Sequence, residues 1–185
     1  KYAVAVNSGT SALHVALIAM GITAGDEVIM PAFTFDPILQ AVMYTGARPV
    51  LTDIDKDSLN MNAGAVKLKL SAKTRAIIVP HMFVMPADIE PICGLGVPVI
   101  EDCAQSHGSK YKGKLTGFYG DVTICSFKVS KIMTTGGAGG MVLTNSSVQY
   151  ARILRSLQYD DNPDYELRFN YRMTDISAAI GNIQI

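Results

Sequence analysis

Apolar residues along this chain gather in seven short runs that are spread evenly from one end to the other. The runs are rich in β-branched residues, and most are apolar throughout instead of alternating with polar positions. That pattern indicates strands that are buried on both faces of a sheet. The predicted strands are Ala3–Asn7, Glu27–Pro31, Pro49–Ile54, Ala76–Pro80, Pro98–Asp102, Thr123–Phe127 and Gly140–Thr144.

Several stretches between these runs have the spacing of helices. Ser11–Met20 carries apolar residues at helical spacing and is followed by Gly21, which suits the left-handed position after a helix end. A second helix is predicted to begin at Asp36-Pro37 and to run to about Tyr44, with Asp36 as the N-cap and Pro37 at the first helical position. Two further helices are predicted over Gln149–Leu157 and Thr174–Gly181. Strands that alternate with helices predict an α/β fold, a three-layer α/β/α sandwich with a mainly parallel seven-stranded sheet.

The 185 residues suit one domain with one core, and both ends fall inside predicted elements. The chain opens at Lys1 within the first strand, and the last helical segment runs from Met173 to Ile185. We therefore expect the sequence to be part of a longer polypeptide. Sixteen basic residues balance sixteen acidic ones, which gives no electrostatic drive toward nucleic acid or an anionic membrane. A hydrophobic content of 49% excludes a disordered chain and predicts a soluble globular one.

The cysteines and histidines form no recognisable ligand pattern. The three cysteines include no CxxC pair, and the three histidines complete no metal-ligand spacing. We predict neither a disulfide framework nor a metal site, as expected for a protein of the cytoplasm. No run of about 18 apolar residues is present, so no membrane span is predicted.

Ligands of parallel sheets bind beyond the carboxyl ends of the strands, and the residues after the first strand suit an anion. The stretch Asn7–Ser11 places small hydroxyl residues and Gly9 at the start of a helix. Free backbone N–H groups and the positive end of the helix dipole bind phosphate at such a position. The alternative is an ordinary helix cap made by serine or threonine.

Two more predicted strands end in or are followed by residues that could bind a cofactor or take part in catalysis. Asp102 ends the fifth strand, and a buried carboxylate needs a cationic partner, which a protonated ring nitrogen would supply. Alternatively, Asp102 caps the next segment. Lys131 follows the sixth strand, where a low-dielectric pocket would lower its pKa and make it an amine nucleophile. The alternative is a surface lysine with a packed stem. The glycine-rich turn Gly136–Gly140 leads into a strand and so does not match a dinucleotide-binding motif.

Phosphate donors, a carboxylate for a ring nitrogen and a reactive lysine are together what pyridoxal phosphate (PLP) requires. Phe33 and Phe35 follow the second strand, where an aromatic side chain would stack on the cofactor ring. The alternative is that both are core aromatics, and we expect at least one of them to be buried.

These motifs resemble the nucleotide-sugar aminotransferases of the DegT/StrS type, which have PLP fold type I. The resemblance spans essentially all 185 residues, in seven ordered blocks with family-like spacing. It implies that residues 1–185 form the PLP-binding large domain, and that an N-terminal segment and a C-terminal small domain lie outside this sequence. The blocks are NSGTSALHVAL, GDEVIMPAFTF, ARPVLTDID, PVIEDCAQSHG, CSFKVSK, TTGGAGGMVLTN and NYRMTDISAAIG.

The resemblance also implies roles for single residues. Lys131 matches the lysine that forms the Schiff base with PLP, and Lys128, although close, does not. Asp102 matches the partner of the pyridine nitrogen, and Gln105 a contact on the side of the phenolic oxygen. Phe35 matches the aromatic residue that covers the ring. The residues that match phosphate ligands are Gly9, Thr10, Ser11 and Ser126 from one subunit and Asn170 from its neighbour. A homodimer with shared active sites is thereby implied.

The activity that the resemblance implies is PLP-dependent transamination of a nucleotide-linked keto-sugar, with an amino-acid donor such as glutamate. The product would be an amino sugar for polysaccharide or secondary-metabolite biosynthesis. Two alternatives stay open. One is a sugar dehydratase of the same family, although those relatives carry histidine where this chain has Lys131. The other is a non-catalytic relative that binds PLP or a sugar nucleotide as a sensor.

The chain departs from the family pattern at three places. Val84 stands where the family usually has glycine. The turn Gly136–Gly140 is one residue longer than the usual one and lacks its acidic residue. The connection from Ile89 to Val97 is short, so only a short helix is predicted there.

Overall fold

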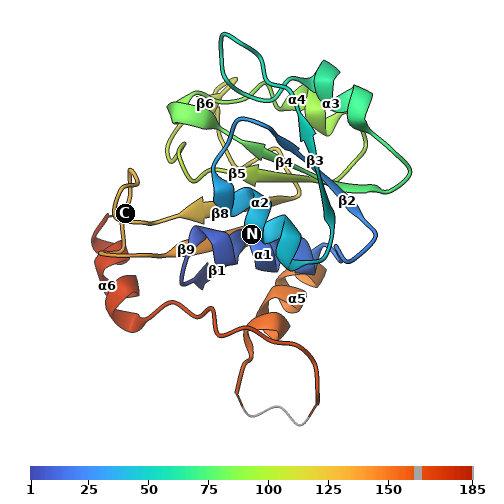
Figure 1. Cartoon of the computed structure of the whole chain (residues 1–185). Coiled ribbons are helices and arrows are strands. Elements are labelled where there is room, and N and C mark those ends of the chain that lie inside the picture. Colours follow the sequence, from blue (N-terminus) through green and yellow to red (C-terminus); the bar gives the residue numbers. More distant parts are fainter. Residues whose placement is uncertain (161–163, 185) are drawn as a thin grey trace.

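The computed structural model describes residues 1–160 and 164–184, and its centre is a seven-stranded sheet (Figure 1). The strands lie in the order β1-β9-β8-β5-β4-β2-β3. The five strands from β8 to β3 pair in parallel, whereas β9 runs antiparallel to both β8 and β1. The strands are β1 (Tyr2–Val6), β2 (Glu27–Pro31), β3 (Arg48–Thr52), β4 (Thr74–Pro80), β5 (Val99–Asp102), β8 (Val122–Ser126) and β9 (Gly140–Thr144). The predicted α/β class and mainly parallel sheet are confirmed.

Helices cover both faces of this sheet (Figure 1). On one face α1 (Gly9–Ala19) lies between α2 (Asp36–Tyr44) and α5 (Ser147–Leu157), and together they bury the larger apolar core. On the other face α3 (Ala63–Lys69) and α4 (Glu90–Cys93) cover a smaller core. The three-layer arrangement is therefore confirmed. Two short strands, β6 (Lys110–Tyr111) and β7 (Lys114–Leu115), form a hairpin apart from the main sheet.

Burial follows the position of each strand in the sheet. Every residue of β2 and β5 is buried, as the uninterrupted apolar runs predicted. The prediction was wrong for β1 and β3, which alternate or mix buried and exposed positions. Both are edge strands, so each has a partner on one side only and part of its surface meets solvent.

The helix ends match the expected signals with one exception. Ser8 caps α1 by accepting a hydrogen bond from the Ser11 backbone N–H, and Gly21 follows that helix with a φ of 81°. Asp36, predicted as the N-cap of α2, is instead its first residue. The N-cap is Phe35, which makes no side-chain cap hydrogen bond, so Pro37 takes the second helical position. The predicted short helix is confirmed as the four-residue α4.

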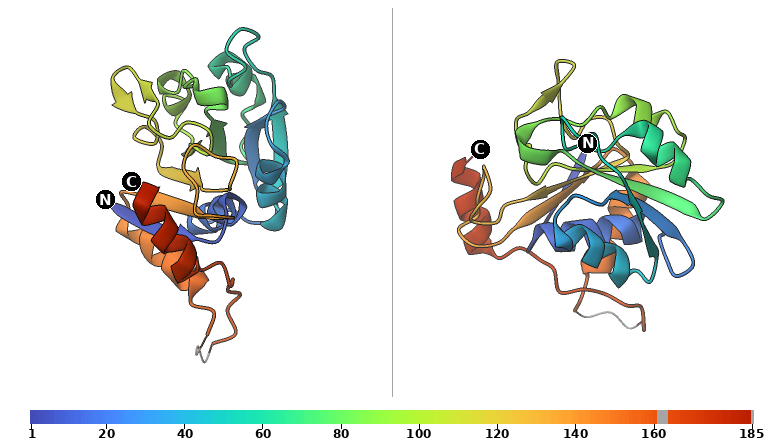
Figure 2. Two further views of the ribbon diagram at one scale, coloured as in Figure 1. Left: turned by 90° about the vertical axis from the view of Figure 1, so that its left-hand side faces the viewer. Right: turned by 45° about the horizontal axis from the view of Figure 1, so that its top comes forward.

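The last helix, α6 (Asp175–Gln184), lies outside the three layers, beside the turn that leads into β9 (Figures 1 and 2). Gly181 of α6 comes so close to Thr135 that an added Cβ would lie 3.0 Å from Thr135 Cγ2. Residue 185, the end of the predicted segment, lies outside the described residues. None of the helices in the described ranges is long and apolar enough to cross a membrane.

Candidate active site

A cavity of about 210 Å³ opens beyond the carboxyl ends of the parallel strands. Its walls come from the residues that follow β1, β2, β4, β5 and β8, which is where a parallel sheet concentrates ligand contacts. The residues with polar side chains around it are Ser8, Thr10, Thr34, His81, Asp102, Gln105, Ser126, Lys128, Ser130 and Lys131. With the turn that precedes β9, six chain segments far apart in sequence thus converge on one site.

The N-terminus of α1 forms one end of the cavity. Ser8, Gly9 and Thr10 all line it, and Ser126 from the end of β8 faces them. A Cβ added to Gly9 would lie 2.7 Å from Ser126 Cβ, so only glycine permits this close approach of helix and strand. The backbone N–H groups at the start of α1, together with the hydroxyls of Thr10 and Ser126, make a site for a phosphate-sized anion.

Asp102 and Lys131 supply the charged groups of the cavity. Asp102 is only 6% exposed, and burial raises the pKa of its carboxyl group. The Ala104 backbone N–H, which donates to Asp102 Oδ1 at 2.9 Å, and the charge of Lys131 act in the opposite direction. Burial lowers the pKa of Lys131; the charge of Asp102 raises it and that of Lys128 lowers it further. The result is a lysine that gives up its proton more readily than an exposed one.

The side chain of Gln105 is oriented by the neighbouring turn, the 3₁₀ helix Met82–Val84. Its Oε1 accepts a hydrogen bond of 3.2 Å from the Phe83 backbone N–H. Its Nε2 has only the sulfur of Met82, at 4.0 Å. The amide therefore has N–H groups available to a ligand oxygen in the cavity that it lines.

Phe35 lies at the mouth of the cavity, where the Nζ of Lys131 lies 5.1 Å from the centre of its ring. Phe35 is 51% exposed and Phe33 is 45% exposed. The expectation that at least one of them is a core aromatic was wrong, because the chain after β2 turns outward before α2 begins. Phe33 instead contacts Phe83, with ring centres 6.4 Å apart.

Seven of the nine residues predicted for the site line the cavity: Gly9, Thr10, Phe35, Asp102, Gln105, Ser126 and Lys131. Ser11 does not, because its hydroxyl donates to Asn7 Oδ1 at 2.6 Å and so fixes the start of α1. Asn170 does not line the cavity either; it is exposed, and its backbone carbonyl accepts a hydrogen bond from Asn7 Nδ2.

Sequence reasoning missed several lining residues. Thr34, His81 and Met82 follow β2 and β4, so the same strand-end rule that singled out Asp102 would have found them. Lys128 was noticed only as a lysine near Lys131. The small residues Ala138 and Gly139 come from the glycine-rich turn, whose approach to the cavity no local pattern reveals.

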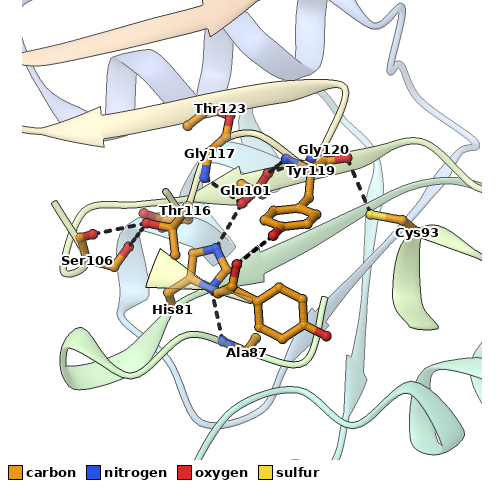
Figure 3. Close-up of polar contacts among 12 residues, drawn as sticks. His81, Ala87, Cys93, Glu101, Ser106, Thr116, Gly117, Tyr119, Gly120 and Thr123 are labelled. Carbon is orange, nitrogen blue, oxygen red and sulfur yellow. Dashed lines mark hydrogen bonds and ion pairs between the residues drawn. The ribbon is translucent and has the colours of Figure 1, made fainter. Parts of the chain in front are cut away.

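Beside the cavity, the buried carboxylate of Glu101 holds a network of hydrogen bonds (Figure 3). It bonds to His81 Nε2 at 3.1 Å and accepts from the backbone N–H groups of Gly117, Tyr119 and Gly120 at 2.5–2.6 Å. Burial acts to raise the pKa of Glu101, but these hydrogen bonds outweigh it, and the pKa lies below its ordinary value. The carboxylate stays ionised because the N–H groups around it donate hydrogen bonds to its charged form.

His81, Glu101 and Cys103 come close enough together to suggest a metal site, but their atoms are already engaged. The Nδ1 of His81 accepts from the Ala87 backbone N–H at 3.0 Å, so Nε2 carries the proton and donates to Glu101 (Figure 3). Burial raises the pKa of the Cys103 thiol, which keeps it protonated. This cluster therefore builds structure and offers no free ligand atom to an ion.

Fold and cavity define the general class: an α/β domain with a ligand site at its strand ends that carries a helix-terminus anion site, a buried aspartate and an activated lysine. More particularly, the chain belongs to the DegT/DnrJ/EryC1/StrS aminotransferase family, whose model matches residues 1–185.

Comparison with single proteins agrees with this assignment. The chain is 42% identical over 199 residues to GDP-perosamine synthase from Escherichia coli O157:H7, with 100% of this chain and 53% of that protein covered. The crystal structure of an aminotransferase from Psychrobacter cryohalolentis matches with a TM-score of 0.92 and 38% identity, over 100% of this chain and 51% of that one. A sugar aminotransferase from Streptococcus pneumoniae in its PLP form matches with a TM-score of 0.89 and 26% identity, over 98% and 54%. The chain spans about half the length of the curated relatives it matches.

Proposed function

We propose that this chain is the cofactor-binding part of a PLP-dependent aminotransferase that acts on a nucleotide-linked keto-sugar. The observation that carries the proposal is one cavity that holds Lys131, Asp102 and the N-terminus of α1 together. Each of these groups would bind a different part of the PLP molecule. Membership in an aminotransferase family and the PLP form of one similar structure support it.

The residues present fit the cofactor. Its phosphate would be held by the N-terminus of α1, with hydroxyls from Thr10 and Ser126. The close approach of Gly9 to Ser126 leaves no room for a side chain between these donors. Asp102 would face the pyridine nitrogen, and Phe35 would cover the ring. Lys131 is the amine available to the aldehyde.

When bound, PLP supplies an electron sink that makes the Cα proton of an amino acid acidic. The Nζ of Lys131 would accept and return that proton, because burial lowers its pKa and so makes its unprotonated form easier to reach. The carboxylate of Asp102 would keep the proton on the ring nitrogen, because opposite charges stabilise each other's ionised form. Gln105 offers an N–H group to an oxygen on the ring.

The substrate proposal rests on relatives. GDP-perosamine synthase from Escherichia coli, whose name gives a nucleotide-linked amino sugar as the product, supports a nucleotide-linked sugar as the amino acceptor. An amino-acid donor such as glutamate is what the family resemblance implies. The dehydratase alternative is disfavoured by Lys131 itself, which stands in the cavity with a lowered pKa. The sensor alternative is disfavoured because the cavity contains both an amine whose pKa is lowered, on Lys131, and the buried carboxyl group of Asp102.

We also propose that the protein acts as a homodimer in which Asn170 completes the cavity of the partner subunit. Its exposed position outside the cavity of its own chain is compatible with that role. Several apolar side chains near the cavity mouth are at least half exposed, namely Phe35, Phe83, Val84 and Met85, which suits a surface that another subunit covers.

The test is donor-dependent amine transfer. The protein with PLP is incubated with glutamate and a nucleotide-linked 4-keto-sugar, and the products are followed by mass spectrometry. We expect one amino sugar and one 2-oxoglutarate for each turnover, and no product from Lys131→Ala. Equal turnover by Lys131→Ala would reject the mechanism, and release of water from the sugar without amine transfer would favour the dehydratase.

A further inference from the structure

The glycine-rich turn before β9 lies between the cavity and α6. Ala138 and Gly139 of this turn line the cavity. On the side of α6, a Cβ added to Gly136 would lie 2.6 Å from Ile180 Cδ1. Figure 1 shows α6 beside this turn, apart from the three layers. The helix therefore touches a part of the cavity wall from outside.

A second contact joins α6 to Thr135, at the start of the turn. Gly181 is the buried residue of α6, and a Cβ added to it would lie 3.0 Å from Thr135 Cγ2. Thr135 is itself only 3% exposed. A side chain at position 181 would have to push Thr135 aside, because both residues are enclosed by their neighbours.

Thr135 is hydrogen-bonded to the segment that carries Lys131. Its backbone N–H donates to the Phe127 carbonyl oxygen at 3.1 Å. Its hydroxyl donates to the Ala138 carbonyl oxygen at 3.1 Å and has the Phe127 carbonyl oxygen at 3.4 Å. Thr135 thus connects the turn to the residue that directly follows β8.

The rest of the turn pairs with the same segment. The Phe127 N–H donates to the Gly139 carbonyl oxygen at 2.8 Å, and the Val129 N–H donates to the Gly137 carbonyl oxygen at 2.9 Å. The Lys131 N–H donates back within its own segment at 2.8 Å. A displacement of the turn would therefore be passed through hydrogen bonds to the backbone of Lys131.

We propose that Thr135 is a positioning residue for Lys131, and that its own position is set by the close approach of Gly181 from α6. The inference rests on the proposed function, since Lys131 is the amine that would react with PLP. A helix outside the cavity thereby fixes where the reacting amine stands.

The test adds a methyl group at this contact and then removes the methyl group that it meets. Gly181→Ala introduces the Cβ, and Thr135→Ser removes Cγ2 but keeps the hydroxyl. Alanine suits a helix better than glycine does, so Gly181→Ala does not weaken α6 itself. Gly64→Ala is the matched control, because its Cβ would also lie 3.0 Å from a neighbouring atom, Asn62 Oδ1, in a helix that does not line the cavity.

Wild type, the three single variants and the double variant Gly181→Ala/Thr135→Ser are compared by two readouts of Lys131. The first is labelling of the protein by acetic anhydride at a series of pH values, with the Lys131 peptide followed by mass spectrometry. This readout needs no PLP. The second is the rate at which PLP reacts with the protein, followed by visible absorbance. The free energy of unfolding is measured alongside.

We expect Gly181→Ala to react with PLP about threefold to tenfold more slowly than wild type, because a small displacement of a reacting group slows its reaction. The midpoint of Lys131 labelling should move to higher pH, since burial is the largest cause of its lowered pKa and a displaced segment encloses the amine less well. The double variant should match Thr135→Ser alone in both readouts, because the added methyl group then meets no Cγ2. Gly64→Ala should behave as wild type. A purely structural contact would change the free energy of unfolding and leave both readouts unchanged.

Three outcomes overturn the inference in distinguishable ways. If wild type reacts with PLP and Gly181→Ala keeps both its rate and its labelling midpoint, the contact does not position Lys131 and the proposed function stands. If the double variant stays as slow as Gly181→Ala, the effect does not pass through Thr135. If wild type does not react with PLP, the proposed function fails, and the positioning role fails with it.

Discussion

Two lysines line the cavity, Lys131 and Lys128, and they differ in their exposure to solvent. Lys131 is partly buried, whereas Lys128 is exposed at the same wall, and the charge of Lys128 lowers the pKa of Lys131. Among the described residues neither lysine forms a salt bridge with an acidic side chain within 4.0 Å. Lys128 therefore makes the Lys131 amine easier to deprotonate.

Replacement of Lys128 by methionine should raise the pKa of Lys131, because a neighbouring positive charge is removed. Fewer Lys131 amines are then neutral at pH 7, and their reaction with PLP should slow by about twofold to fivefold. The measurement is the rate of this reaction against pH, whose midpoint should move to higher pH. Lys128→Arg should leave the midpoint in place, and so should Lys69→Met, which removes an exposed charge outside the cavity. An unchanged midpoint in Lys128→Met would contradict the electrostatic role.

Val84 occupies a backbone conformation that disfavours its own side chain. Its φ is 67° and that of Phe83 is 53°, so two successive residues lie in the left-handed region. This geometry explains why glycine suits the position better than valine, which is branched at Cβ. Its side chain is 52% exposed and adds little packing. The turn is retained because the Val84 N–H donates to the Gln105 carbonyl oxygen at 3.2 Å.

Val84→Gly should therefore stabilise the protein by about 1 kcal/mol, measured by chemical denaturation. Val148→Gly makes the same chemical change at a similarly exposed valine, but inside α5. There the glycine should destabilise by about 0.5–1 kcal/mol. If both variants lose stability alike, Val84 carries no strain.

At the scale of elements, Glu101 joins segments that would otherwise meet only through the sheet. Its carboxylate connects the end of β4, through His81, to the loop Gly117–Gly120 that leads into β8. Asp102 follows Glu101 on β5, and the backbone N–H of His81 donates to the Asp102 carbonyl oxygen at 3.1 Å. The network therefore fixes the strands whose ends carry Asp102 and Ser126.

Glu101→Gln should destabilise the protein by at least about 3 kcal/mol, because an amide nitrogen would face donors in a buried site. Guanidinium denaturation measures the loss. Since the folded-state pKa of Glu101 lies below its unfolded value, the stability that its charge contributes is present above about pH 4.3 and is lost as pH falls through the folded pKa. The variant should accordingly lose less stability on acidification than wild type. Glu90→Gln, which breaks an exposed pair with Lys112, should change little.

At the scale of the whole molecule, the proposed dimer makes a prediction about mixed subunits. Lys131→Ala removes the reacting amine of one chain, and Asn170→Ala removes the phosphate contact offered to its partner. In a mixed dimer one site carries both defects and the other carries neither. Equal mixing and reassembly should restore about a quarter of the sites, measured as PLP absorbance at low PLP concentration. No recovery after verified subunit exchange would show that the sites are not shared in this way.

Much of this fold can be predicted from the local pattern of apolar and polar residues. All seven main strands were predicted within two residues, because buried parallel strands are short, apolar and bounded by turn residues. The helix α3 and the hairpin of β6 and β7 were missed, since α3 has seven residues and the hairpin strands two each, too short for a periodic signal.

The site was predictable to the extent that it lies at strand ends. Asp102, Ser126 and Lys131 follow from that rule together with their chemistry. The approach of Gly181 to Thr135, the orientation of Gln105 and the engagement of Ser11 with Asn7 depend on contacts between distant segments. Sequence spacing does not specify such contacts, because they arise only when the layers pack.

The central claim is that Lys131 and the groups around it form a PLP site, and a visible absorption spectrum tests it most directly. Wild type, Lys131→Ala and Lys128→Ala are each titrated with PLP, so that each variant lacks one lysine of the same cavity wall. The account predicts a long-wavelength band in wild type and Lys128→Ala that is absent from Lys131→Ala. A band of equal strength in Lys131→Ala, or none in wild type, would contradict it.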